Sequence, residues 1–268
     1  MILEKTPTER FKTVVKNSLA TLRIDVRGWR SITQWDQRAD TPRLDSEQLQ
    51  RITKYSADTL STYAESLRDA DIEETWEWQS TPMVESLLSG ALIHKRIVNI
   101  GCAYVKAEKA LCEKYPEVTW DMLDFAPDLA QVNEDIAAPN MNFVSCYPLE
   151  FLETTDHKYD IALFNRTLTV IVNAEVRNYF LELVKRCRYI VFCKVGSVLR
   201  FIRSIDVDKI PAKHSLPARG NMFIHNYRAI LEDCGFELRQ YDAHRVPWHG
   251  EQHYLIKGIA ENKKPSLV

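Results

Sequence analysis

The residues with the clearest chemical pattern lie between Arg96 and Leu111, in the stretch RIVNIGCAYVKAEKAL. An apolar run ends at Gly101, and a helical pattern begins a few residues later. A glycine at such a turn lets a ligand approach the backbone, because it has no Cβ atom. A loop for a dinucleotide pyrophosphate has two further glycines, where this chain has Ala103 and Lys106. The stretch therefore fits a cofactor site of another kind, a degenerate dinucleotide loop or an ordinary strand-to-helix turn.

An acid follows this loop at the distance that a nucleotide site requires. In open α/β sheets, ligands bind outside the carboxyl ends of the strands, and an acid at the end of the second strand binds the ribose hydroxyls, about 20 residues after the loop. Asp124 ends the apolar segment VTWDMLD at that distance, and Phe125 follows it. We therefore expect both residues to lie beside the loop at Gly101.

The segments that must position these residues alternate between strand and helix patterns after Gly90. Continuous apolar strands separated by helices are typical of a parallel sheet covered on both faces. The expected strands of this kind are RIVNIG, VTWDMLD, NFVS, YDIALFN and YIVFCKV. The last two strand-like segments, FELRQYDAHRV and EQHYLIKGIA, are separated only by the turn PWHG, which predicts an antiparallel hairpin.

The first third of the chain has helical patterns and few glycines. One helix is expected to begin at Thr6, where the run Thr-Pro-Thr-Glu carries the signals of a capped first turn. A second is expected over residues 46–67, and a third over residues 81–90, beginning with Thr-Pro and ending at a glycine. We predict a helical N-terminal cap over residues 1–90, for substrate or dimerisation, and an α/β domain over residues 91–268.

Composition and charge exclude several classes of protein. Of the 268 residues, 45% are hydrophobic and 27% charged, and the formal net charge of -2 provides no positive field for nucleic acid or an anionic membrane. No apolar run reaches the roughly 20 residues of a membrane span, and the charged start MILEKTPTER does not predict a signal peptide. The six cysteines have no CxxC or Cys/His spacing, so no metal site is predicted and a cytoplasmic location is expected.

Four segments across about residues 95–195 resemble the class I S-adenosylmethionine-dependent methyltransferases in order and spacing: IVNIGCAYVKAEKAL, VTWDMLDFAPDLA, NFVSCYPLEFL and YDIALFNRTLTVI. The resemblance implies an α/β, Rossmann-like class I methyltransferase sheet, mostly parallel, with an antiparallel terminal hairpin and an α-helical N-terminal cap. It also implies S-adenosylmethionine as the cofactor.

The residues that match the motifs of this family are its implied cofactor site. In the first motif, Asn99 takes the place of an acid, and Gly101, Cys102, Ala103 and Val105 take the place of a Gly-x-Gly-x-Gly loop. In the other three motifs, the matching residues are Asp124 for the ribose hydroxyls, Phe125 beside the adenine, Cys146 and Tyr147 at the adenine ring, and Asn165 and Arg166 facing the methyl group and the substrate.

Methyl transfer to a hydroxyl or a protonated amine requires removal of a proton, and histidine is the natural base at neutral pH. The topology brings His214, His225, His249 and His253 to the carboxyl edge of the sheet. We predict His225 or His249 as the base and Arg166 as a substrate anchor. The segment ETWEWQSTPM offers Trp76 and Trp78 as aromatic walls for an acceptor or as packing between cap and sheet.

The leading hypothesis is methyl transfer to a small-molecule acceptor, most simply a hydroxyl, by a cytoplasmic enzyme of a biosynthetic pathway. Three alternatives stay open. One is N-methylation of a small metabolite, and another is a methyltransferase-fold partner or scaffold protein without catalysis. The last is an NAD-dependent oxidoreductase, which fits the loop less well because a pyrophosphate needs close backbone approach. Neither a nucleic-acid partner nor a membrane is expected, and the N-terminal helices are a candidate homodimer interface.

Overall fold

A computed structural model describes residues 60–171, 173–197, 207–213, 215–217, 223–248 and 251–264. The helix predicted from Thr6 and most of the helix predicted over residues 46–67 lie outside these ranges. In the described part of the chain, no helix has the length and apolarity that a membrane crossing requires.

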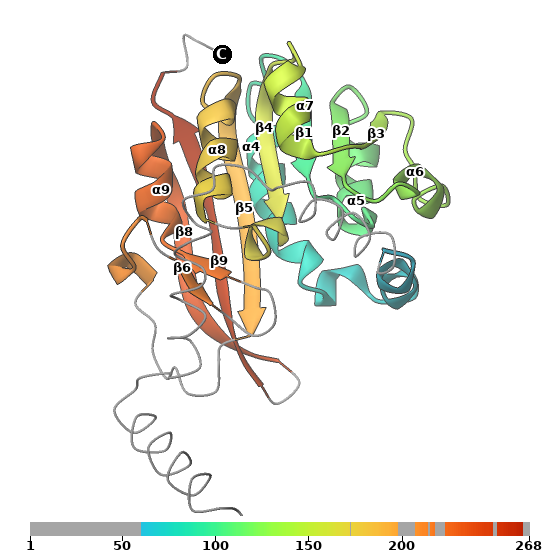
Figure 1. The fold of residues 1–268 in the computed structure, drawn as a ribbon. Coiled ribbons are helices and arrows are strands. Elements are labelled where there is room, and N and C mark those ends of the chain that lie inside the picture. The colour runs from blue at the N-terminus through green and yellow to red at the C-terminus, as the bar shows by residue number, and fades with distance from the viewer. Residues whose placement is uncertain are drawn as a thin grey trace, which may run out of the picture.

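The described elements form a seven-stranded sheet with the order β3-β2-β1-β4-β5-β9-β8 (Figure 1). Strands β1 to β5 are parallel, whereas β9 pairs antiparallel with both β5 and β8. The bounds are β1 Arg96–Ile100, β2 Thr119–Asp124, β3 Met141–Ser145, β4 Tyr159–Asn165, β5 Cys187–Ser197, β8 Phe236–Trp248 and β9 Glu251–Asn262. The predicted parallel strands and the terminal hairpin are thus confirmed. Strand order reverses between β1 and β4, so their carboxyl ends flank the switch point where open α/β sheets bind ligands.

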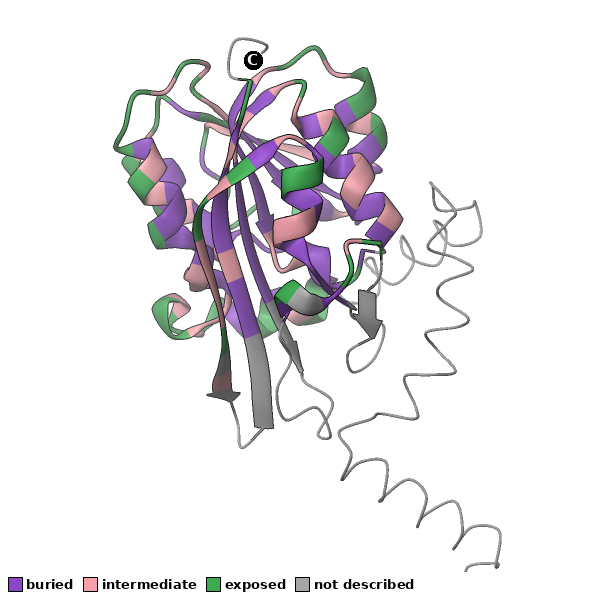
Figure 2. Ribbon diagram, turned by 90° about the vertical axis from the view of Figure 1, so that its left-hand side faces the viewer, coloured by how far each residue is buried: buried purple, intermediate pink, exposed green. Residues whose placement is uncertain are grey.

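Helices cover both faces of the sheet, and Figure 2 shows the buried strands between them. One face carries α4 Thr81–Leu88, α5 Lys106–Lys114 and α6 Leu129–Val132; the other carries α7 Pro148–Thr154, α8 Asn173–Leu183 and α9 Tyr227–Asp233. Strand β4 shows why: Ile161 and Leu163 pack on the first face, and Ala162 and Phe164 pack on the second. A strand with apolar side chains on both of its faces requires a cover on both sides.

Shorter elements complete the described fold. Beside the main sheet, β6 Ser215–Pro217 and β7 Phe223–His225 form a two-stranded antiparallel sheet. Four 3-10 turns, η1 Ile72–Glu74, η2 Glu77–Ser80, η3 Thr167–Thr169 and η4 Val207–Lys209, lie between the longer elements.

The N-terminal region reaches the sheet through a helix over residues 60–68, then η1, η2 and α4. Helix α4 confirms the third predicted helix, with Pro82 in its first turn. Lys106 Nζ donates to the carbonyls of Leu67, Arg68 and Ala70 at 2.7–2.8 Å, and a cation at a helix carboxyl end binds the free carbonyls there. The lysine that replaces a dinucleotide-loop glycine therefore joins α5 to the N-terminal region. The division at residue 90 stays a prediction.

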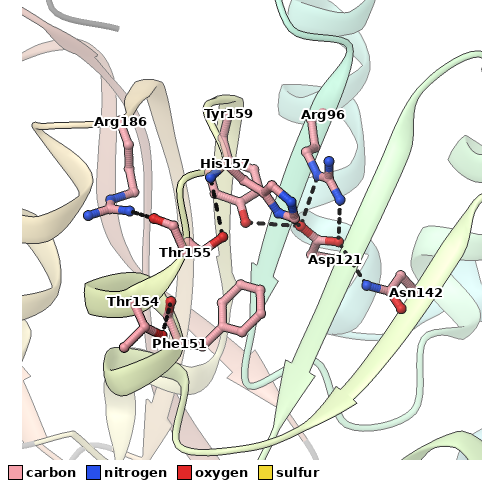
Figure 3. Close-up of polar contacts among 9 residues, drawn as sticks. All are labelled: Arg96, Asp121, Asn142, Phe151, Thr154, Thr155, His157, Tyr159 and Arg186. Atoms are coloured by element: carbon pink, nitrogen blue, oxygen red, sulfur yellow. Dashed lines mark hydrogen bonds and ion pairs between the residues drawn. The ribbon is translucent and has the colours of Figure 1, made fainter.

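At the amino end of the sheet, the buried carboxylate of Asp121 organises a polar network (Figure 3). Arg96 donates from Nε and Nη2 to the two carboxylate oxygens at 3.0 and 3.2 Å. Asn142 Nδ2 and the Tyr159 hydroxyl donate at 3.1 and 2.9 Å. Burial raises the pKa of Asp121, but these hydrogen bonds outweigh it and hold the pKa below its ordinary value. The network joins β1, β2, β3 and β4 at the edge opposite the carboxyl ends.

Replacement of Asp121 with alanine is expected to lower the free energy of unfolding by about 3 kcal/mol, because it leaves the Arg96 guanidinium without its acceptor. Because the folded pKa is depressed, the stabilisation is present above the unfolded pKa and is lost as pH falls through the folded pKa. Urea unfolding at pH 7 and at a series of lower pH values measures both effects. The exposed pair Lys109–Glu113 supplies the control, since Glu113→Gln should change stability by less than about 0.5 kcal/mol. An Asp121→Ala protein as stable as the control would contradict the role given to this network.

Candidate active site

The loop after β1 has the backbone of a glycine-rich loop although it holds one glycine. Gly101 has φ 68°, and a Cβ atom there would lie 2.4 Å from Cγ2 of Thr167, so no other residue fits without displacing η3. Ala103, where the second family glycine is expected, has φ 50°, which also belongs to the left-handed region. This conformation costs a residue with a Cβ atom roughly 1 kcal/mol. The loop therefore keeps the backbone conformation that glycine favours despite the change in sequence.

Asp124 lies at the end of β2 and joins two loops, as its spacing predicted. Its Oδ2 accepts from the Ala103 amide at 3.1 Å, and its Oδ1 accepts from the Ala126 amide at 3.0 Å. The side chain is buried, which raises its pKa above the ordinary value, while these backbone hydrogen bonds act in the opposite direction. A carboxylate has about four acceptor positions, so it can bind further donors.

Beside Asp124, two aromatic rings stack directly on each other. Phe125 and Tyr147 have ring centroids 5.4 Å apart and an interplanar angle of 27°. The Tyr147 hydroxyl donates to Glu175 Oε1 of α8 at 2.7 Å, and burial raises the pKa of Glu175 to about 7. Burial also raises the pKa of Cys146, to about 11, and that of Cys102. Both thiols are therefore neutral at pH 7.

The predicted residues Asn99 and Asn165 meet at a residue that the motifs did not single out. Asn99 Nδ2 of β1 and Asn165 Nδ2 of β4 donate to the same atom, Glu108 Oε1 of α5, at 3.1 and 3.3 Å. Glu108 is buried, and burial raises its pKa to about 7. The signal that could have found it is its spacing, because Glu108 lies three and four positions before Leu111 and Cys112 on the apolar face of α5.

Arg166 takes part in an ion pair with the N-terminal region. Its backbone has φ 70°, and its amide donates to the Cys193 carbonyl at 2.7 Å. Its Nη1 donates to Glu77 Oε1 and, at 3.3 Å, to the Tyr63 hydroxyl, which itself donates to Glu77 Oε1 at 2.6 Å. We call these three residues the Arg166 cluster. The cluster attaches η2 and the helix over residues 60–68 to the carboxyl end of β4.

Of the two predicted bases, the structure describes His225 but not His249. His225 is fully buried at the end of β7, and its Nε2 lies 2.9 Å from the Ile171 carbonyl. Burial, and then the charge of Lys194, lowers the pKa of His225 to about 3. Asn226 caps α9 by accepting from the Ala229 amide at 3.0 Å. This position does not favour His225 as a base for a substrate, and His249 and His214 lie outside the described residues.

A hollow of about 260 Å³ lies between the α4 region and the terminal hairpin. Its lining includes Trp78, one of the two predicted aromatic-wall residues, with Met83, Gln240 and Lys257, and it includes none of the predicted cofactor or catalytic residues. Trp76 packs beside Cys193 and Leu255. In the described residues, no group of three or more His, Cys, Asp or Glu side chains could hold a metal ion.

No protein-family model and no curated protein matches this sequence. Solved structures do match its fold. Magnesium protoporphyrin IX methyltransferase from Synechocystis PCC 6803, with bound S-adenosylmethionine, is 13% identical with a TM-score of 0.50, and the match covers 77% of this chain and 96% of that one. The 1,6-didemethyltoxoflavin-N1-methyltransferase from Burkholderia thailandensis, with bound 1,6-didemethyltoxoflavin and S-adenosylhomocysteine, is 16% identical with the same TM-score, covering 79% and 90%.

The chain has a class I methyltransferase fold. In that fold, the carboxyl edge of β1, β2 and β4 carries two sets of polar contacts. Asp124 binds the loop at Ala103, and Asn99 and Asn165 bind Glu108. The predicted cofactor residues are thereby brought together at one edge of the sheet, with Arg166 beside them. His225, in contrast, points its ring at a backbone carbonyl in the interior.

Proposed function

We propose that the protein is an S-adenosylmethionine-dependent methyltransferase acting on a small-molecule acceptor, most simply at a hydroxyl group. One observation carries the proposal: the left-handed loop at Gly101 and Ala103 is bound by Asp124 at the end of the next strand. This is the position and residue type that ribose recognition requires.

The chemistry of the site fits the proposed cofactor. Two buried oxygens, Oδ1 of Asn99 and Oδ1 of Asn165, have no hydrogen-bond partner. A buried acceptor without a donor costs roughly 1–3 kcal/mol, so the site favours a ligand that brings N–H or O–H groups. S-adenosylmethionine carries an ammonium group and two ribose hydroxyls. Asp124 would hold the hydroxyls, and Phe125 and Tyr147 would lie against the adenine ring.

When bound, the cofactor supplies a methyl group already activated on a sulfonium. The contribution of the chain is then to bind, orient and exclude water. Positioning of this kind is worth roughly 7–11 kcal/mol of the barrier. The Arg166 cluster joins the N-terminal region to the edge where transfer would occur, and in this way helps to exclude water. Of the two predicted bases, we assign proton removal to His249, because His225 is buried against a carbonyl.

Calorimetric titration with S-adenosylmethionine, S-adenosylhomocysteine and NADH tests the proposal. Micromolar binding of the first two, without binding of NADH, is the expected result, and an acceptor screen with hydroxyl and amine compounds follows from it. Binding of NADH alone would replace the proposal by an oxidoreductase.

A second candidate is a methyltransferase-fold scaffold or partner protein without catalysis. It is favoured by the replacement of the first-motif acid by Asn99 and by the backbone hydrogen bonds that both Asp124 oxygens already accept. A folded protein that binds neither adenosyl compound would select this candidate.

A further inference from the structure

The switch point of the sheet holds a buried carboxylate that comes from a helix rather than from a strand. Glu108 lies in the first turn of α5, and its side chain reaches back to β1 and β4. It is 4% exposed. A carboxylate in the first turn of a helix is favoured by the partial positive charge of the helix amino end. The two carboxamides that donate to it, Asn99 and Asn165, flank the reversal of strand order.

The same two carboxamides are incompletely bonded. Asn99 Nδ2 donates to Glu108 Oε1, and Asn165 Nδ2 donates both to Glu108 Oε1 and, at 2.9 Å, to the Glu77 carbonyl. The Oδ1 atom of each carboxamide is buried and has no partner. Asn99 is fully buried. Buried side-chain oxygens are satisfied in the large majority of folded proteins. Beside the buried carboxylate there are thus two carboxamide oxygens that lack a donor, and a cation with several N–H groups would supply both a charge and donors.

The sequence supports this assignment independently. The acid expected at the end of the first strand is replaced by Asn99, which has no charge. Glu108 restores a carboxylate nine positions later, hydrogen bonded to the replacing residue itself. The carboxylate thus comes from the helix instead of the strand, and it contacts the strand residue that replaces the expected acid.

We propose that Glu108 is the acid that binds the α-ammonium group of S-adenosylmethionine, held in position by Asn99 and Asn165. The assignment rests on the proposed function. It gives the chain a charged partner for the cofactor where the motif residue is neutral, and it makes Asn99 and Asn165 positioning residues. In the absence of a cation, burial raises the pKa of the Glu108 carboxyl group to about 7.

The test compares two ligands on two proteins by calorimetry. S-adenosylhomocysteine carries the ammonium group, whereas 5′-methylthioadenosine shares its adenosine and thioether but has no amino-acid part. The replacement Glu108→Gln is expected to weaken the binding of S-adenosylhomocysteine about 10- to 100-fold, which is the range of a hydrogen bond to a charged group. The affinity for 5′-methylthioadenosine should not change. Equal weakening of both ligands would show a structural role only and overturn the proposal, as would no change in either.

A second variant keeps the test independent of folding. Adding Asn99→Asp to Glu108→Gln returns the acid to the strand, and it is expected to recover most of the lost affinity for S-adenosylhomocysteine. Thermal unfolding of each variant reports whether the fold is kept. If a well-folded double variant stays as weak as Glu108→Gln alone, the charge is not the contribution of Glu108. Failure of the wild-type protein to bind either ligand would instead reject the proposed function.

The pH dependence gives a further readout. A charged Glu108 favours the ammonium group, so wild-type affinity for S-adenosylhomocysteine should fall about tenfold per pH unit below pH 7. The titratable groups around Glu108 do not have a pKa near 7. The pKa of Glu77 is lowered, and those of Tyr63, Cys102 and Cys112 are raised above their ordinary values. Glu175, near Tyr147, also has a pKa of about 7, so the decisive quantity is the difference between wild type and Glu108→Gln. The same slope in both proteins would contradict the proposal.

Discussion

Replacement of Asp124 with alanine is expected to weaken the binding of S-adenosylhomocysteine at least about 100-fold, the largest effect expected of any single change at the site. In the proposed site, the Asp124 carboxylate accepts hydrogen bonds from two ribose hydroxyls. Each charged hydrogen bond removed lowers the binding free energy by roughly 1.5–3 kcal/mol. The replacement also leaves the Ala103 and Ala126 amides without their acceptor, so the loop loses its anchor on β2. Calorimetry with S-adenosylhomocysteine measures the loss.

A milder variant separates binding from folding. Asp124→Asn keeps one acceptor oxygen for the loop but removes the charge. It is expected to weaken ligand binding at least tenfold and to lower thermal stability less than Asp124→Ala does, because only one of the two loop amides loses its acceptor. Glu117→Gln is the matched control, because Glu117 is an exposed carboxylate just before the opposite end of the same strand. If Asp124→Asn binds S-adenosylhomocysteine as tightly as the control does, Asp124 has only a structural role and the proposed site is misplaced.

The sheet could be predicted from the sequence because its signals are local. Strand β4 is apolar at nearly every position, which requires cover on both faces, and the short turn between β8 and β9 permits only a hairpin. The position of Asp124 followed from its spacing after Gly101. These inferences need no knowledge of contacts between distant segments.

The connections within the site depend on distant contacts and were not predictable. Glu108 looked like one more charged residue of a helix, and only the packing of α5 against β1 and β4 makes it a buried partner of Asn99. Glu77 and Arg166 are 89 positions apart, and no local pattern indicates their ion pair. His225 ends β7, just before the cap of α9, and the burial that lowers its pKa is a property of the whole fold.

In the sequence, Ala103 stands where a glycine-rich loop has its second glycine, which suggests that the loop conformation is lost. The structure shows that the conformation is kept. The φ of 50° at Ala103 shows that the packing of the loop determines the backbone conformation even when the residue has a Cβ atom. The hydrogen bond from its amide to Asp124 is one reason why this conformation persists. Loss of a glycine is therefore weaker evidence against a cofactor loop than the residue type suggests.

The Arg166 cluster leads to the second large expected effect. Arg166→Met should lower the free energy of unfolding by about 2 kcal/mol, because it leaves the carboxylate of Glu77, only 8% exposed, without its cation. In a double-mutant cycle with Glu77→Gln, measured by urea unfolding, the coupling should exceed about 1 kcal/mol. The exposed pair Arg68–Asp135 is the control, with side chains 50% and 45% exposed and an expected coupling below that value.

The pH dependence of this coupling distinguishes a structural ion pair from a substrate anchor. Burial raises the pKa of Glu77, but Arg166 and Tyr63 outweigh it and hold the pKa below its ordinary value. The coupling is therefore present above the unfolded pKa and is lost as pH falls through the folded pKa. A substrate anchor would give a different pattern, in which Arg166→Met lowers ligand turnover or binding but leaves stability and its pH dependence unchanged. Full coupling at pH 7 that is lost as pH falls through the folded pKa of Glu77 would show that Arg166 mainly attaches the N-terminal region to the edge of the sheet where the proposed cofactor binds.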